Sequence, residues 1–338
     1  MKILFLNIYQ NKVARGAERF VYELGLRLKK NHQVDIISSD KVPVRRWPFV
    51  WRSFLDPQGI QICLFTLKSL SRIWREKYDI VIPLNGGWQP AWVRLVTWLY
   101  GGKVVISGQS GMGWDDRNNL WSFPNAFVAL SGKAKRWARQ VNPLVKASYI
   151  PNGVDTTKFK PEGPSIGTNL KKPIVVCQGA LTKGKRIDLT IKAVAKLGDA
   201  SLLVVGDGEL KEEINKLGNE LLGDRFQLIK APFEDMPKVY RVGDVFTLPS
   251  EAYHSFEIAL VEAMASGLPV VANSDDIRRQ IVGRAGVLVD PTNIDAYAIA
   301  LENALRLRWG RRPQNQAKKF DWDKIAVKYE QLFESLLK

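Results

Sequence analysis

Residues 231–267, APFEDMPKVYRVGDVFTLPSEAYHSFEIALVEAMASG, form the stretch that decides the fold class. An apolar strand is predicted over 244–248, and a Pro-Ser pair ends it. A polar loop follows, and apolar residues then recur at helical spacing over 258–265. A Gly-Leu-Pro sequence stops this helix before a second strand over 270–272. The order strand, loop, helix, strand is typical of an open parallel sheet.

The loop in this stretch occupies the position where open parallel sheets bind anionic ligands. It lies at the carboxyl end of a strand and leads into a helix amino terminus, where unpaired amides and the helix dipole favour phosphate. Glu262 follows about one turn into the helix, and its acceptor oxygens suit a sugar diol. The alternative is a solvated helix glutamate beside a core stripe, since most charged helix residues face water.

Several residues of this region fall into the order of a known donor-binding element: Ser255, Phe256, Glu262, Ala263, Met264, Ala265, Gly267, Pro269, Val270 and Val271. The stretch resembles that element in the retaining glycosyltransferases of family four. The resemblance implies that Glu262 binds the nucleoside ribose. The first glutamate of the element is His254 here, so His254 takes the position near the transferred sugar. Glu251 or Glu257 is the alternative source of the missing carboxylate.

Length and composition indicate an ordinary globular protein with two domains. The chain has 338 residues, of which 46% are hydrophobic and 25% are charged, so disorder is not indicated. Cys63 and Cys177 lie far apart in apolar surroundings, which suggests neither a disulfide framework nor a zinc site. No apolar run approaches the roughly 20 residues that span a bilayer, and residues 1–7 fit a first strand better than a signal peptide. The expected location is the cytoplasm, or the inner face of a membrane as a peripheral protein.

The net charge of +16 implies an anionic partner: nucleic acid, acidic lipid or a phosphorylated substrate. Basic residues are mixed with aromatic ones over 45–54, 72–75 and 306–312. Such mixtures suit the interface of an anionic membrane, and the alternative is a solvated basic loop that packs its aromatic rings inward. A nucleic-acid partner is unlikely, because it leaves Glu262 and the strand-loop-helix pattern unexplained.

Strands and helices alternate along both halves of the chain, which predicts parallel, doubly wound sheets. The pattern predicts, among others, a helix from about residue 64 to 77, a strand over 174–178, and a final helix whose apolar stripe contains Ile325, Tyr329, Leu332, Phe333 and Leu336. Residues 161–173 are rich in Pro, Gly, Ser and Lys without periodicity, and we expect a linker there. The fold class is therefore α/β. The family resemblance implies the GT-B architecture, with two Rossmann-like domains that face a cleft: an acceptor domain over 1–160, a nucleotide-sugar domain over 174–320, and a last helix over 321–338 that crosses back to the first domain.

Two loops of the first half contain candidate site residues. Gly16 lies in a turn that enters a helix, where the backbone can approach a ligand closely, and the turn resembles the Gly-Gly-Ala-Glu element of the family. A second loop, 108–117, follows a strand and is rich in glycine and polar groups. Gln109 or Ser110 is expected to bond a sugar hydroxyl. Asp115 or its neighbour Asp116 would orient the acceptor, or alternatively cap a helix.

In the second half, residues 179–188 place three cations before a helix: Lys183, Lys185 and Arg186. Cations oppose the dipole at a helix amino terminus, so the arrangement suggests a bound anion, with a solvated loop as the alternative. The segment resembles the diphosphate clamp of the family. Lys185 matches its lysine, whereas Ala180 stands in place of its arginine, so Arg186 or Lys183 would supply the missing charge.

The resemblance implies transfer of a sugar from a nucleotide-diphosphate sugar to an acceptor hydroxyl, with retention of anomeric configuration. The acceptor is a carbohydrate or a lipid-linked molecule in polysaccharide or glycolipid assembly. No cofactor or metal is expected. Two other classes stay open: a relative that binds nucleotide sugar without turnover, suggested by Arg15, Ala180 and His254, and a basic nucleic-acid-binding protein. The catalytic candidates are Lys185, Arg186, His254 and Glu262, and the donor-binding candidates are Gly16, Ala180, Lys185, Arg186, Ser255, Phe256, Glu257, Ile258 and Glu262.

Overall fold

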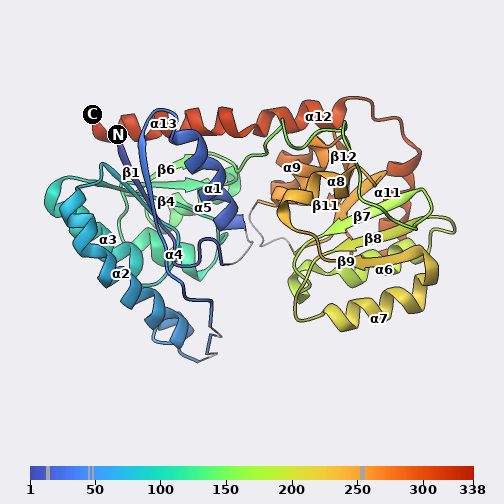
Figure 1. The fold of residues 1–338 in the computed structure, drawn as a ribbon, viewed down its shortest axis with the longest axis horizontal. Helices are drawn as coiled ribbons and strands as arrows, with labels where there is room; N and C mark the ends of the chain where they lie inside the picture. The colour runs from blue at the N-terminus through green and yellow to red at the C-terminus, as the bar shows by residue number, and fades with distance from the viewer. Residues whose placement is uncertain (13–15, 45, 48, 252–255) are drawn as a thin grey trace. The chain divides into compact units, whose positions relative to one another are not determined.

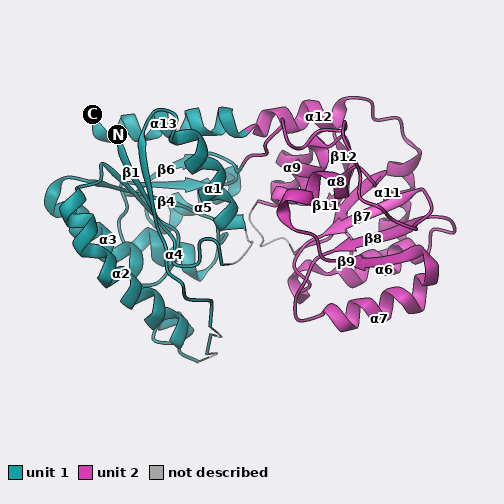
Figure 2. Ribbon diagram, viewed as in Figure 1, with its two compact units in different colours: residues 1–152, 322–338 teal, residues 153–321 magenta. Residues whose placement is uncertain are grey.

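The computed structural model describes residues 1–12, 16–44, 46–47, 49–251 and 256–338. These residues form two compact units, each with its own parallel sheet (Figure 2). Unit 1 contains residues 1–152 and 322–338, and unit 2 contains residues 153–321. Three residues with predicted roles or departures from the family pattern, Arg15, His254 and Ser255, lie outside the described ranges.

Unit 1 is built on a six-stranded sheet with the order β2-β1-β3-β4-β5-β6, in which every neighbouring pair is parallel (Figure 1). Successive residues of its strands are buried on opposite faces, so both faces require a cover of helices. The strands are β1 (Lys2–Leu6), β2 (Gln33–Ile37), β3 (Ile80–Pro83), β4 (Lys103–Ser107), β5 (Ala126–Ala129) and β6 (Lys146–Tyr149).

Helices cover both faces of this sheet. On one face α1 and the last helix, α13, share a core with alternate strand residues such as Phe5 and Ile82. On the other face four helices pack against the intervening strand residues, such as Leu4 and Val81. The helices are α1 (Gly16–Leu28), the short 3-10 helix η1 (Trp51–Ser53), α2 (Pro57–Glu76), α3 (Gln89–Tyr100), α4 (Trp114–Trp121), α5 (Gly132–Val141) and α13 (Trp322–Leu337).

The last helix of the chain belongs to unit 1. Its predicted apolar stripe includes Tyr329 and Phe333, and both are fully buried in the core shared with α1. The ring of Tyr329 lies 5.6 Å from that of Phe20 on α1, centroid to centroid. Burial of such aromatic side chains stabilises the contact by several kcal/mol in total, at roughly 25 cal/mol per Å² of apolar surface.

Unit 2 repeats the architecture with a parallel sheet in the order β12-β11-β10-β7-β8-β9 (Figure 1). Its strands are β7 (Ile174–Gln178), β8 (Ser201–Val205), β9 (Phe226–Ile229), β10 (Val245–Leu248), β11 (Val270–Asn273) and β12 (Gly286–Val289). Its helices are η2 (Lys183–Lys185), α6 (Ile187–Ala195), α7 (Lys211–Leu222), η3 (Gly223–Arg225), η4 (Phe233–Asp235), α8 (Met236–Tyr240), α9 (Ile258–Ala265), α10 (Asp276–Val282), α11 (Ile294–Arg306), α12 (Arg312–Ala317) and η5 (Lys318–Phe320).

One helix boundary differs from the sequence-based expectation. The helix expected from about residue 64 begins at Pro57, because the Asp56 side chain accepts a hydrogen bond from the Gly59 amide and proline suits the first turn. Residues 161–173 have no helix or strand and lie within unit 2, since the units divide at 152/153. The guanidinium of Arg241 holds the start of this segment by donating to the carbonyl oxygens of Lys160 and Pro164.

Candidate functional site

The strand order of unit 2 places a topological switch point between β7 and β10. These two strands are hydrogen-bonded neighbours, but the chain continues from β7 to β8 on one side and from β10 to β11 on the other. The loops that follow β7 and β10 therefore leave neighbouring strands at the carboxyl edge of the sheet, and each leads toward a different side of the sheet. In doubly wound sheets this is where ligands bind.

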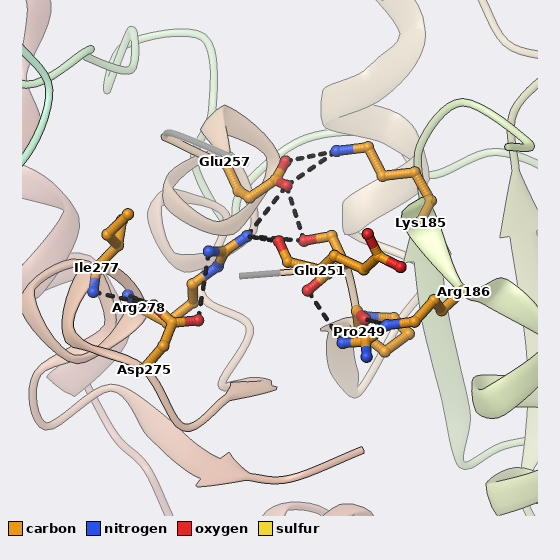
Figure 3. A network of polar contacts seen from close by, with 9 residues as sticks. Lys185, Arg186, Pro249, Glu251, Glu257, Asp275, Ile277 and Arg278 are labelled. Carbon is orange, nitrogen blue, oxygen red and sulfur yellow. Dashed lines mark hydrogen bonds and ion pairs between the residues drawn. The ribbon is translucent and has the colours of Figure 1, made fainter. Parts of the chain in front are cut away.

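Backbone and side-chain bonds join the two loops (Figure 3). The Glu251 amide donates to the Gly184 carbonyl oxygen at 2.9 Å. Arg186 donates from Nε to the Pro249 carbonyl oxygen at 2.7 Å and from Nη2 to that of Ser250 at 3.2 Å. Arg186 thus fastens one loop to the other, and both of these acceptors are neutral carbonyls.

Lys185 forms an ion pair with Glu257 at the centre of this arrangement (Figure 3). Its Nζ lies 2.9 Å from both carboxylate oxygens, and both side chains are largely buried. The Ser250 hydroxyl donates to the same carboxylate at 2.7 Å. Burial alone raises the pKa of Glu257, but the charges of Lys185 and Arg278 and these hydrogen bonds outweigh it and hold the pKa below its usual 4.5.

Arg278 is a fully buried member of the cluster that sequence reasoning missed. Its Nη2 lies 3.3 Å from Glu257 and donates to the Ser250 hydroxyl at 2.9 Å, while Nη1 lies 3.3 Å from an oxygen of Asp275. Asp275 caps α10, because its side chain accepts from the amides of residues 277 and 278. The sequence contained a signal for this arrangement: a helix-capping aspartate three residues before an arginine.

The helix of the deciding stretch, α9, begins at Ile258, and Glu257 is its N-cap residue. The Glu257 side chain makes no capping hydrogen bond to α9 and turns to Lys185 and Arg278 instead. Phe256 is buried, with its ring 5.6 Å from that of Phe320. The sequence predicts an anion-binding site at this helix end. Glu257 places a negative charge there, which makes the helix end less favourable for an anion.

Glu262 is buried inside unit 2 on α9, so the alternative of a solvated helix glutamate is wrong. Its Oε2 accepts a hydrogen bond from the Tyr240 hydroxyl at 3.0 Å. Glu262 lies five positions after Glu257, which corresponds to about 7.5 Å along a helix axis. Helix α9 thus connects the buried carboxylate of Glu262 to the ion pair of Lys185.

The other predicted residues of the clamp loop have different surroundings. Ala180 is exposed in the loop after β7, and its carbonyl oxygen accepts from the Thr182 amide. Lys183 is exposed at the start of η2. The solvated-loop alternative thus describes Lys183, whereas Lys185 is held by Glu257.

Unit 1 has a switch point of its own between β1 and β3, and sequence reasoning missed the residues there. The Asn85 side chain accepts from the Ile8 amide at 3.0 Å and donates to Asn7 at 3.3 Å. Asn7 in turn donates to the side chain of Gln10 at 3.0 Å and to Glu18 at 3.4 Å. The available signal was an asparagine soon after each buried strand. Gly16, a predicted site residue, is the first residue of α1, the helix that follows β1 in the chain.

The predicted residues after β4 are spread over several environments. Gln109 exchanges reciprocal hydrogen bonds with Asn152, at 3.1 and 2.9 Å, and is half-buried. Ser110 is exposed. Asp115 lies 3.4 Å from the guanidinium of Arg46. The alternative of a helix cap by Asp115 or Asp116 is wrong, because α4 begins after Gly113 without a side-chain cap.

Asp116 is a buried carboxyl of α4 that contrasts with Glu257. Burial raises its pKa to about 8, the hydrogen bond from Asn119 opposes the rise, and the charge of Asp115 adds to it.

Across the part of the chain that the structure describes, no three His, Cys, Asp or Glu side chains gather as metal ligands.

Comparison with known proteins identifies the class. Residues 14–158 match a family model described as Glycosyltransferase Family 4, and residues 172–306 match one described as Glycosyl transferases group 1. The two sheets and their helices match solved glycosyltransferases of the GT-B fold. The chain belongs to the family-four glycosyltransferases.

Individual relatives are more distant. The chain is 30% identical over 222 residues to the phosphatidyl-myo-inositol mannosyltransferase of Mycolicibacterium smegmatis, a match that covers 62% of this chain and 57% of the relative. It thus spans little more than half the length of that relative. The sucrose-phosphate synthase of Thermosynechococcus elongatus is 19% identical with a TM-score of 0.79, covering 99% of this chain and 98% of the other. HepE of Anabaena, solved with UDP and glucose, is 17% identical with a TM-score of 0.75, covering 99% and 100%.

Proposed function

We propose that this chain is a retaining glycosyltransferase that moves a sugar from a nucleotide-diphosphate sugar to an acceptor hydroxyl, in glycolipid or polysaccharide assembly at a membrane surface. The observation that carries the proposal is the charged cluster at the switch point of unit 2, with Lys185 at its centre. A cation held at the carboxyl edge of a doubly wound sheet suits a diphosphate. The relative solved with UDP and glucose supports the choice of donor class.

Lys185 and Arg186 would stabilise the negative charge that grows on the leaving diphosphate. An ammonium group has three donors, so Lys185 can contact phosphate oxygens while it keeps a bond to Glu257. Arg278 would hold Glu257 in place and balance its negative charge when Lys185 turns toward the donor. Stabilisation of developing charge by fixed groups is commonly the largest contribution to catalysis. Because these cations are present, the proposed step needs no metal ion.

The buried carboxylate of Glu262 would accept hydrogen bonds from the ribose hydroxyls. Tyr240 fixes one of its oxygens, which orients the carboxylate before the nucleotide arrives. In the proposed step the bond between the anomeric carbon and the leaving phosphate oxygen breaks. A bond to the acceptor oxygen forms on the same face of the sugar, and the acceptor proton passes to the departing phosphate. This route conserves the anomeric configuration without a protein nucleophile.

Unit 1 would bind the sugar and acceptor side through neutral groups, among them Asn85, Gln109 and Ser110. Amides and hydroxyls match the donor and acceptor pattern of sugar hydroxyls. His254 would lie near the transferred sugar, as the family pattern implies. The mannosyltransferase relative carries phosphatidyl-myo-inositol in its name, which supports a glycolipid acceptor here.

A thermal-shift panel of nucleotides and nucleotide sugars, followed by transfer assays, tests the proposal. A bound donor raises the melting temperature by mass action. We expect a diphosphate sugar to stabilise the wild type and Lys185→Ala to lose that response. Lys192→Ala is the matched control, because Lys192 forms an exposed ion pair with Asp188 on α6. Stabilisation by no nucleotide sugar would refute the proposal, binding without turnover would indicate a non-catalytic relative, and product of inverted configuration would refute retention.

A further inference from the structure

Two neighbouring helices of unit 1 each expose an apolar stripe to solvent. On α2 the stripe contains Ile60, Leu64, Leu67 and Trp74, and on α3 it contains Trp88, Trp92, Leu95, Trp98 and Leu99. The spacings of three and four residues put each set on one side of its helix. Trp98 is 65% exposed and Leu99 is 59% exposed, values unusual for such large apolar side chains.

The two stripes face the same way. The opposite sides of the helices, represented by Ile73 on α2 and Val93 on α3, are buried in one core on the same face of the sheet. The helices also pack against each other, and the ring of Trp74 lies 6.2 Å from that of Tyr100. We call the residues of both stripes together the outer face. An exposed apolar surface built on two helices marks an interaction site.

The outer face continues onto neighbouring elements. Arg94 of α3 donates to the carbonyl oxygen of Phe123 at 2.8 Å, and the exposed ring of Phe123 lies 6.2 Å from that of Trp121. Exposed aromatic residues thus extend from α3 to the end of α4. Tryptophan at the border of an apolar surface is typical of proteins that insert into the headgroup region of a bilayer.

Cations border the outer face along α2. Lys68, Arg72 and Arg75 are exposed: Lys68 follows Leu67, Arg75 follows Trp74, and Arg72 lies two positions before Trp74. Within α3 the charged residue is Arg94, and α3 contains no acidic residue. On α2 the acidic residue Glu76 is already paired with Lys2. Arg72 lies 3.5 Å from a carboxylate oxygen of Asp35, and Arg75 lies 3.6 Å from one of Glu76, so the cations are partly compensated while the charge beside the outer face stays positive.

A hollow of about 350 Å³ lies at the edge of α2, where Lys68 and Arg72 form part of its wall. The serines 38, 39 and 69 line it as well, and so does Asp40, whose carboxylate lies 3.3 Å from Nζ of Lys12. Hydroxyl donors combined with two cations suit a phosphate group. The apolar stripe and a polar hollow thus lie on adjacent sides of one helix.

We propose that the outer face of unit 1 docks on an anionic lipid bilayer, with the side chains of α3 in the headgroup boundary and a lipid phosphate beside Lys68 and Arg72. Charge favours a bilayer over a second copy of this chain. In a symmetric dimer the same surface meets itself, so Lys68, Arg72 and Arg75 would face their own equivalents. An anionic bilayer compensates these charges instead. The inference deepens the membrane part of the proposed function.

Vesicle sedimentation without donor tests the docking. We expect the full chain to bind vesicles of phosphatidylglycerol and phosphatidylcholine at low salt, and to bind pure phosphatidylcholine vesicles at least tenfold more weakly. Leu95→Ser combined with Leu99→Ser should weaken binding at least tenfold. The control is Ile299→Ser combined with Leu307→Ser, which removes two similarly exposed residues from unit 2 and should leave binding unchanged.

A second pair of variants tests the phosphate seat. Lys68→Gln combined with Arg72→Gln should weaken binding to phosphatidylglycerol vesicles about tenfold. Lys211→Gln combined with Lys216→Gln removes the same charge from α7, where both residues are exposed, and should have a much smaller effect. Equal losses for the two pairs would refute a specific seat and leave net charge as the cause.

Two results would overturn the docking itself. The first is the absence of vesicle binding by the wild type. The second is a dimer, detected by light scattering, that the Leu95/Leu99 variant disperses, since the face would then bind a second copy. Failure of the proposed function has a different outcome: a protein that binds vesicles while no nucleotide sugar raises its melting temperature keeps the docking and loses the enzyme activity.

Discussion

In unit 2 the loops after β7 and β10 are joined by ionised side chains, whereas in unit 1 the loops after β1 and β3 are joined mainly by amides. Lys185, Glu257 and Arg278 form the first network, and Asn7 and Asn85 are central to the second. Both networks lie at the switch point of a six-stranded parallel sheet. The backbone therefore selects the position of a site, and the side chains select its chemistry.

This difference suits two kinds of ligand: a diphosphate in unit 2 and a sugar in unit 1. A diphosphate is an anion that requires cations, and a buried cation requires a carboxylate when the ligand is absent. Sugar hydroxyls are neutral and both donate and accept, which amides satisfy without a charge in either state.

The largest expected effect is on stability in the charged network. Arg278→Gln removes a buried cation and leaves Glu257 and Asp275 with less compensation. Breaking a buried ion pair by removing one partner costs roughly 3 kcal/mol or more. Chemical denaturation measures the loss. Arg279→Gln, which changes the exposed neighbour on α10, is the matched control. Equal stability of the two variants would mean that the cluster does not hold this region together.

The next largest effect is on activity. Lys185→Ala should lower kcat/KM by roughly 100-fold, because a charged contact to the leaving diphosphate is lost. Stability should fall less than in Arg278→Gln, since the Lys185 side chain is 16% exposed against 1% for Arg278, and Arg278 still faces Glu257. Steady-state kinetics with the donor identified by thermal shift provide the measurement, with Lys192→Ala as control. Full activity of Lys185→Ala would separate the charged switch point from catalysis.

The amide network of unit 1 should respond more weakly. Asn85→Ala removes an acceptor for the Ile8 amide and a donor to Asn7, which are neutral hydrogen bonds of about 1 kcal/mol each. We expect kcat/KM for the acceptor to fall roughly tenfold while the affinity for the free nucleoside diphosphate is unchanged. Asn219→Ala, an exposed change on α7, is the control. A loss of nucleoside-diphosphate affinity in Asn85→Ala would contradict the division between the two units.

Sequence patterns predicted the sheets well because strands and helices alternate with strong periodicity. The boundaries of β7 were predicted as observed, and α9 begins at the expected Ile258. The start of α2 was missed because a single cap, Asp56, decides it. The site was predicted in part: Lys185 and Glu262 were singled out by motif.

The partners of these residues could not be predicted. Arg278 meets Glu257 across 21 positions of sequence, and only the packing of α10 beside α9 brings them together. Asn7 and Asn85 are 78 positions apart and meet because β1 and β3 are neighbours. Local patterns do not determine such long-range pairs, since these depend on the order of strands in the sheet.

The smallest predicted effect concerns two buried carboxyls, Glu257 in unit 2 and Asp116 in unit 1. Burial raises the pKa of both, but only Glu257 has neighbouring cations that lower it. Cations hold the pKa of Glu257 below 4.5, whereas burial raises the pKa of Asp116 to about 8. Glu257 therefore stabilises its unit above about pH 4.5, and this contribution is lost as pH falls through its lower folded-state pKa. The contribution of Asp116 is present below its unfolded pKa near 3.8 and is lost as pH rises through about 8.

Asp116→Asn should consequently change the pH dependence of unit 1 more than its stability at low pH. Because the amide cannot ionise, the variant should gain on the wild type as pH rises from about 5 to about 8, so its melting temperature should rise relative to the wild type over that range. Glu257→Gln should instead lose its disadvantage only below about pH 4.5. Melting curves of both variants across this range measure the two trends. Parallel curves for Asp116→Asn and wild type would show that Asp116 is ionised throughout, and that unit 1, like unit 2, supplies its buried carboxyl with a compensating partner.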